Sequence, residues 1–194
     1  MKKIIYSLVI SLVLTAGITS LCGGFEEEMQ NGITRLHIVA DSDSRRAQSV
    51  KLKVRDAVLE NVDLSEENFL EKAEQTARGV LKAEGENYGA KAYYGKFYFP
   101  SKQYKNITLP AGEYYGVRLV LGSGSGQNWW CVMYPPMCAV GGDEAKLEKS
   151  SEKLLRSSVS PESCELITDN GDKVKIKFKT VEIAQNIKHW LSEK

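Results

Sequence analysis

The sequence has few of the residues on which enzymes and metal sites most often depend. Only two histidines occur among 194 residues, and none of the four cysteines has the C-x-x-C spacing or the Cys/His clustering of a zinc site. The formal net charge is +1, so no excess of either sign favours nucleic acid or lipid headgroups. These absences exclude zinc-binding folds and strongly basic nucleic-acid-binding proteins.

The motifs of common hydrolases are absent too. Nucleophilic catalysis needs a base beside the nucleophile, and the two histidines available are His37 and His189. There is no G-x-S-x-G elbow and no Asp-Thr/Ser-Gly of the aspartic-protease kind. A Cys131–His37 dyad stays open as an alternative, although no neighbouring motif supports it. The sequence therefore predicts a protein with no catalytic residues, no metal and no cofactor.

Two patterns look like ligand sites but do not meet the requirements of one. The run GSGSG at 122–126 lacks the lysine of a phosphate loop, and it precedes a predicted strand where such a loop would precede a helix. We interpret it as a flexible loop between strands. His37, Asp41 and Asp43 would share one face of an extended chain and could hold a metal. A histidine at the core edge followed by helix-capping aspartates explains them better.

The N-terminus has the pattern of an export segment. Two lysines precede the apolar run from Ile4 to Ile18, and charge returns only at Glu26. This pattern is typical of a secretory signal peptide, although no A-x-A cleavage motif occurs. The uncharged run is also just long enough to span a bilayer. We expect residues 1–24 to be a signal peptide or a membrane anchor, which if uncleaved is the only membrane contact, and the remainder to lie outside the cytoplasmic membrane.

Three cysteines follow this segment, and an odd number is a poor disulfide framework. Cys131 and Cys138 flank the turn at Pro135 and Pro136 and could pair, which would stabilise the fold by about 2–3 kcal/mol. Two small buried residues are an equally good interpretation. The sequence leaves this pairing open.

Hydrophobic periodicity predicts an α+β domain over residues 30–142. A buried strand at 34–40 precedes an amphipathic helix that reaches about residue 62, and a second helix is expected to begin at a Ser65 cap with Glu66 and Glu67 in its first turn. Strands are predicted at 91–99, 113–121 and 128–134. This order predicts a single domain with a mostly antiparallel sheet and helices packed on it, after the N-terminal export helix.

The remaining residues, 143–194, are predicted to form a C-terminal extension. Its expected elements are a helical stretch at 143–156, a hairpin turn at Asn170 and Gly171, a half-exposed strand at 174–178 and a helix at about 181–191. No internal repeat occurs.

An aromatic cluster adjoins the glycine run. Strand alternation would place Trp129 and Cys131 on one face of the sheet and Trp130 and Val132 on the other. We expect at least one of the two tryptophans to be core and the other to lie near a partner site, because aromatic anchors are common in binding hot spots.

Three long motifs in a fixed order resemble stage II sporulation protein R of endospore-forming Firmicutes. They are RLHIVADSDS running into KLKVRDAVLE, then NITLPAGEY, then GQNWWCVMYPPMC, which together span residues 35–138. The chain departs from the family's usual motif at Asp41, where that motif has Asn. No motif of this family continues after Gly142.

The resemblance implies a role that the residues alone do not indicate. Such a protein is made in the forespore and exported into the space between the two cells' membranes. There it activates a membrane-embedded aspartic-type peptidase of the mother cell, which processes the sigma-E precursor. The alternative is a cell-envelope hydrolase or a glycan-binding module that uses the Tyr- and Trp-rich strands as a platform.

The same reasoning gives a hypothetical partner surface. Packing requires neither Asn128 beside two tryptophans nor paired prolines at a strand end, and one helix needs only one cap. The residues that we assign to partner binding are Asp41, Ser42, Asp43, Arg55, Asp56, Gly126, Asn128, Trp129, Trp130, Pro135 and Pro136.

Overall fold

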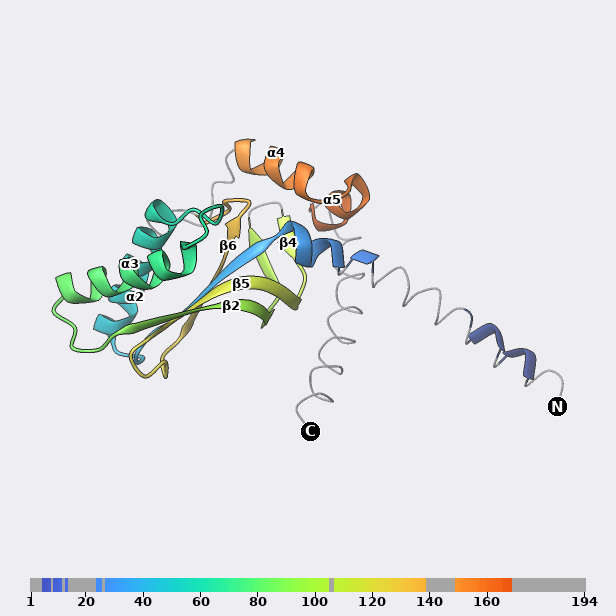
Figure 1. Cartoon of the computed structure of the whole chain (residues 1–194). Coiled ribbons are helices and arrows are strands. Elements are labelled where there is room, and N and C mark those ends of the chain that lie inside the picture. The colour runs from blue at the N-terminus through green and yellow to red at the C-terminus, as the bar shows by residue number, and fades with distance from the viewer. Residues whose placement is uncertain are drawn as a thin grey trace.

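The centre of the molecule is a four-stranded sheet with the strand order β2-β5-β1-β6 (Figure 1). The computed structural model describes residues 5–7, 9–11, 13, 24, 25, 27–104, 107–138 and 149–168. The sheet consists of β1 (Thr34–Val39), β2 (Ala90–Phe99), β5 (Gly112–Leu121) and β6 (Asn128–Tyr134). The pairs β1–β6 and β2–β5 are antiparallel, and β1–β5 is parallel. The predicted α+β fold with a mostly antiparallel sheet is confirmed.

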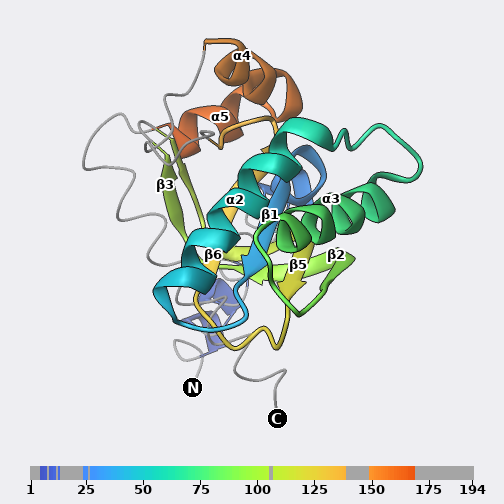
Figure 2. The same cartoon turned by 90° about the vertical axis from the view of Figure 1, so that its left-hand side faces the viewer.

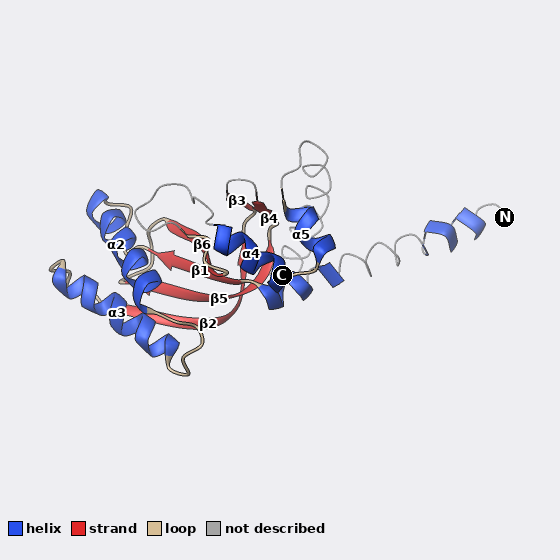
Figure 3. Ribbon diagram, turned by 90° about the horizontal axis from the view of Figure 1, so that it is seen from above, coloured by secondary structure: helices blue, strands red, loops and turns tan. Residues whose placement is uncertain are grey.

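Two helices cover one face of this sheet. Helices α2 (Arg45–Asn61) and α3 (Phe69–Ala83) lie side by side over it, with α2 nearer β6 (Figure 2; Figure 3). The valines that recur at helical spacing along α2, Val50, Val54 and Val58, are buried against Leu36 and Ile38 of β1. Full burial of such a side chain contributes about 1.5–3 kcal/mol relative to exposure, so this stripe fixes the rotation of α2 on the sheet.

The predicted start of the second helix is wrong. The chain forms turns over residues 63–68, and α3 begins only at Phe69, after Asn68. The backbone N–H of Ser65 donates to Oδ1 of Asp63 (2.8 Å), so this side chain closes a local turn where a helix was expected. Glu66 therefore precedes the helix and pairs with Lys72 (2.7 Å).

The opposite face of the sheet is covered at one end. Its cover consists of a helical segment at 27–32, the small hairpin of β3 (Lys102–Tyr104) and β4 (Ile107–Leu109), and the helices α4 (Lys149–Ser158) and α5 (Pro161–Ile167). Side chains from all of these elements share a second core with Phe99 and Val132. The sequence predicted neither the hairpin nor α5, and the expected helix at 143–156 is observed from Lys149 onwards.

Several predictions concern parts of the chain outside the described residues. These are most of the export segment at 1–24, residues 143–148 of the expected helix, the hairpin turn at Asn170 and Gly171, the strand at 174–178 and the last helix. Within the described ranges, no helix combines the length and apolar character needed to cross a bilayer.

Cys131 and Cys138 form a disulfide, which the sequence had left open. Their Cα atoms are 5.8 Å apart, a separation typical of disulfides. The bond closes the loop that contains Pro135 and Pro136, and the third of these cysteines, Cys164, is free and buried. The disulfide therefore holds the segment after β6 against the strand.

Replacing both Cys131 and Cys138 by alanine is expected to lower the free energy of unfolding by about 2–3 kcal/mol, because the bond restricts the unfolded chain. Urea unfolding of wild type and variant, each with and without a thiol reductant, measures this. Reductant should destabilise only the wild type. A wild type that is insensitive to reductant would show that the bond contributes no stability.

Candidate functional site

The glycine run after β5 is tied to the turn after β1. The backbone N–H of Ser123 donates to Oδ1 of Asp41 (2.8 Å), and that of Gln127 donates to Oδ1 of Asp43 (2.8 Å). The N–H of Gly126 also reaches the carbonyl of Ala40 (2.9 Å). The run is a loop between β5 and β6, as predicted, and these hydrogen bonds hold it to the turn. The aspartates bind the loop where helix capping was expected. Ser44 alone caps α2, accepting from the N–H of Ala47 (3.1 Å).

The contact between the two segments depends on glycine. Gly122 and Gly124 have φ values of +56° and +64°, a region that L side chains rarely adopt. A Cβ on Gly126 would overlap the backbone carbonyl of Ser42. The glycines of this run therefore allow the backbone of the loop to come close to the backbone of the Asp41–Ser44 turn.

Helix α2 supports this junction from behind. Nε2 of Gln48 donates to the carbonyl of Ser42 (2.9 Å), and Nζ of Lys51 donates to the carbonyl of Gln127 (2.9 Å) and to Oε1 of Gln48 (2.6 Å). Lys51 is only 4% exposed, and its burial lowers its pKa. The lysine thus carries a buried charge next to the glycine loop.

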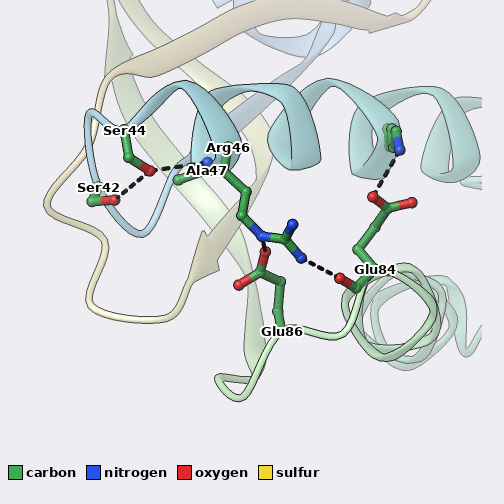
Figure 4. A network of polar contacts seen from close by, with 7 residues as sticks. Ser42, Ser44, Arg46, Ala47, Glu84 and Glu86 are labelled. Atoms are coloured by element: carbon green, nitrogen blue, oxygen red, sulfur yellow. Dashed lines mark hydrogen bonds and ion pairs between the residues drawn. The ribbon is translucent and has the colours of Figure 1, made fainter.

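The start of α2 is also held to the segment that follows α3. Nε of Arg46 donates to Glu86 (2.7 Å) and its NH2 group donates to the carbonyl of Glu84 (2.5 Å), while the side chain of Glu84 pairs with Lys53 (2.7 Å) (Figure 4). Exposed pairs of this kind contribute about 0–1 kcal/mol each, so they orient the helix more than they stabilise it.

The two tryptophans lie on opposite faces of β6, as predicted from alternation. Trp129 packs against the core under α2, beneath the guanidinium of Arg55 at 4.6 Å from the ring centroid. Trp130 stacks on His37 with ring centroids 3.7 Å apart. Both indoles are half-buried and each packs against one of the two core clusters.

A groove of about 350 Å³ opens where these features meet. It is bordered by α2, by the start of β6 and by one residue of β3. Its lining residues are Gln48, Lys51, Leu52, Lys102, Gln127, Asn128, Trp129 and Trp130. The groove combines aromatic walls, amide groups and two lysines, which suits recognition of a polar chain.

The structure brings together most of the predicted partner-binding set. Asn128, Trp129 and Trp130 line the groove, and Asp41, Ser42, Asp43 and Gly126 form the junction that shapes it. Arg55 is buried and pairs with Asp56 (2.6 Å), so it acts on the groove through Trp129. Pro135 and Pro136 do not line the groove; they lie beyond the far end of β6, inside the disulfide loop.

Five lining residues were missed by sequence reasoning: Gln48, Lys51, Leu52, Lys102 and Gln127. One signal was available, because Lys51 follows Val50 and precedes Val54 by three positions, which puts a lysine on the buried stripe of α2. Lys102 carried no such signal, since the β3–β4 hairpin was not predicted.

Two chemical alternatives are tested by this geometry. Cys131 is held in a disulfide and is paired in register with Leu36, whereas His37 is paired with Trp130. The Cys131–His37 dyad is therefore overturned. Across the part of the chain that the structure describes, no three His, Cys, Asp or Glu side chains gather as metal ligands. Asp41 and Asp43 instead accept hydrogen bonds from the loop.

His37 is a buried neutral base beside the groove. Burial lowers its pKa to about 4, and the charge of Arg118 acts in the same direction, while its hydrogen bond from Nε2 to Oδ1 of Asn128 (2.7 Å) opposes them. In the unfolded chain the pKa is 6.5. Between these values the unfolded state binds a proton that the folded state does not, so stability is lost as pH falls from 6.5 towards 4.

Replacing His37 by phenylalanine, which keeps a ring against Trp130, is expected to remove this pH dependence. Urea midpoints measured from pH 7 down to pH 4 should fall more steeply for the wild type than for the variant. Parallel curves for the two proteins would contradict a depressed pKa at this position.

Comparison with known proteins gives two matches. Residues 30–144 match the family model described as Stage II sporulation protein R (spore_II_R). The chain is also 33% identical over 155 residues to Stage II sporulation protein R of Bacillus subtilis (strain 168), an alignment that covers 73% of this chain and 69% of that protein. No solved structure matches. The matched residues include both the Asp41–Ser44 turn and the whole of β6.

Proposed function

The chain belongs to the stage II sporulation protein R family, and from that premise we propose that it is an exported intercellular signal of endospore formation. In this proposal it leaves the forespore, enters the space between the two membranes and activates a membrane-embedded aspartic-type peptidase. The activated peptidase then processes the sigma-E precursor. The protein itself recognises a partner and performs no catalysis.

One observation supports this proposal most directly. The described groove is built from an edge strand, two half-buried indoles and amide side chains, and this layout resembles a binding hot spot with a polar rim. The histidine beside it, His37, is committed to Asn128 and to the stack with Trp130. The disulfide also suits an oxidising extracytoplasmic location.

The proposal can be tested by reconstitution in a bacterium that does not sporulate. The peptidase, the sigma-E precursor and the full chain are expressed together, and shortening of the precursor is followed by immunoblot. We expect shortening with the full chain and none with a variant that lacks residues 4–18 and stays in the cytoplasm. Shortening by that variant without detectable export would refute the requirement for export.

The partner surface can be tested on the same samples. Asp41, Asp43, Asn128 and Trp130 are replaced singly by alanine, and melting temperature and processing are measured side by side. Replacing Asp41 or Asp43 should lower both the melting temperature and processing, because each side chain accepts a hydrogen bond from the loop. Replacing Asn128 or Trp130 should lower processing by more than the loss of protein stability explains. If processing follows stability at all four positions, this surface is scaffold only.

A second candidate function is binding to cell-wall glycan. It is favoured by the exposed Tyr94 of β2, which is stacked on Tyr115 with ring centroids 5.9 Å apart, and by the exposed Tyr93 on the other face of the same strand. Sedimentation of the purified protein with peptidoglycan distinguishes the two functions. Co-sedimentation that is lost when Tyr93 and Tyr94 are replaced by alanine would favour the glycan platform.

A further inference from the structure

The groove lies along an unpaired strand edge. In the four-stranded sheet β6 pairs with β1 alone, so its other side has no strand partner in the described chain. The far half of that side is covered by the disulfide loop, since the carbonyl of Val132 accepts from the N–H of Met137 (3.3 Å) and Sγ of Cys138 lies 3.1 Å from the same oxygen. The part that borders the groove is the start of the strand, Asn128–Trp130. An extended peptide can add to such an edge through main-chain hydrogen bonds. Side chains of an added strand would alternate between the two faces, on which Trp129 and Trp130 lie.

The groove also carries uncompensated positive charge. Nζ of Lys51 donates to two neutral oxygens, and no carboxylate lies within ion-pair distance of it among the residues that the structure places. The carboxylate of Asp43 attracts the Lys51 ammonium electrostatically, but its hydrogen bond is with the backbone N–H of Gln127. Lys102 is exposed on the same groove, and no acidic side chain lines it. A buried ammonium is stabilised by an anionic partner, because burial has removed its hydration.

We propose that this groove binds an extended, carboxylate-bearing segment of a protein partner, which adds as a strand to β6 and places an acidic side chain between Lys51 and Lys102. The identification of that partner with the activated peptidase rests on the proposed function. The mode of binding rests on the edge strand, the lysines and the two indoles.

The aromatic walls favour a peptide over a small anion. Trp129 and Trp130 offer apolar surface on both sides of the edge, and free phosphate uses neither apolar surface nor the alternating backbone groups of a strand. Lys51 lies at the α2 border of the groove and Lys102 at the β3 border. The positive charge of these two lysines therefore defines where along β6 the acidic residue of the peptide binds.

The test uses three probes on the isotope-labelled exported protein: acetyl-Glu-Val-Glu-Val-Glu-amide, its glutamine counterpart acetyl-Gln-Val-Gln-Val-Gln-amide, and inorganic phosphate. NMR titration follows the indole signals of Trp129 and Trp130 and the backbone amides of β6. The glutamate peptide is expected to shift these signals, with binding weakened by added salt. Lys102→Glu should weaken it about tenfold, the effect of roughly one lost charge pair.

Lys82→Glu is the matched control, since Lys82 is an exposed lysine of α3 outside the groove and should leave binding unchanged. Equal binding of the glutamine peptide would overturn the role of the carboxylate. Phosphate that produces the same shifts at the same strength would overturn strand addition and leave a simple anion site. Absence of shifts with the glutamate peptide would overturn the proposal as a whole.

Precursor processing separates this inference from the proposed function. Suppose that the precursor is shortened equally well with the Lys102→Glu and the Lys82→Glu proteins, but not with the variant lacking residues 4–18. The acidic-segment proposal then fails and the signalling function stands. If the full wild-type chain binds the glutamate peptide but the precursor is not shortened, the signalling function fails and the acidic-segment proposal stands.

Discussion

Replacing Gly126 by alanine is expected to destabilise the protein by about 3 kcal/mol and to disrupt the groove. The added methyl group would overlap the carbonyl of Ser42, which is backbone and is itself held by Gln48. The loop would have to move away, which weakens the hydrogen bonds to Ala40, Asp41 and Asp43. Steric misfit of this kind costs about 1–3 kcal/mol, and each lost hydrogen bond about 0.5–1.5 kcal/mol.

The matched control is the same chemical change at Gly79. This glycine lies within α3, and a Cβ there would meet nothing within 4 Å. Because alanine is the better helix former, Gly79→Ala should stabilise by up to about 1 kcal/mol. Urea unfolding of the two variants tests for opposite signs. A Gly126→Ala protein as stable as the wild type would show that the loop does not need close approach to the Asp41–Ser44 turn.

Replacing Phe99 by alanine is expected to cost about 3–5 kcal/mol. The ring is fully buried where both the sheet and its cover meet, with centroid distances of 5.2 Å to Trp130 and 6.1 Å to Tyr114. The guanidinium of Arg35 lies over the same ring at 4.5 Å from its centroid. Arg35 is itself fully buried and its Nε has no partner in the described structure, so loss of the ring removes a favourable contact from a buried charge.

Phe97→Ala serves as the control on the same strand and the same face. Phe97 is half-buried and packs against the edge of the second core, and the guanidinium of Arg118 lies farther from its ring, at 5.9 Å from the centroid, so its loss should cost clearly less. Differential scanning calorimetry or urea unfolding of the two variants measures the difference. Equal losses in the free energy of unfolding would mean that the aromatic cluster around Phe99 contributes no more to stability than the contacts of Phe97. Trp130 fluorescence should change in Phe99→Ala, because the ring borders that indole.

The strands of the four-stranded sheet and helix α2 could be predicted from the sequence because their signals are local. The bounds of β6 agree with the predicted strand at 128–134, since paired prolines end it and Gly126 precedes it. The valine stripe of α2 likewise required no knowledge of the rest of the chain. Alternation correctly assigned Trp129 and Trp130 to opposite faces.

The rest of the site depends on contacts between distant segments, which local patterns do not reveal. Nothing near Asp41 or Asp43 indicates that their carboxylates bind a loop more than eighty residues away, so helix capping was the natural interpretation. Lys102 was missed because β3 has three residues, too few to show a period. Pairing of Cys131 with Cys138 likewise depends on the path of the chain through the turn.

The junction between the Asp41–Ser44 turn and the glycine loop has a consequence for the order in which the domain folds. Its hydrogen bonds join residues 82 and 84 positions apart, and β1 must also pair with β5 and β6. Contacts of such long sequence separation form late, because the intervening loop must close first. The groove therefore cannot form until the chain is complete as far as Trp130, and we expect it to be among the last features of the domain to form during folding.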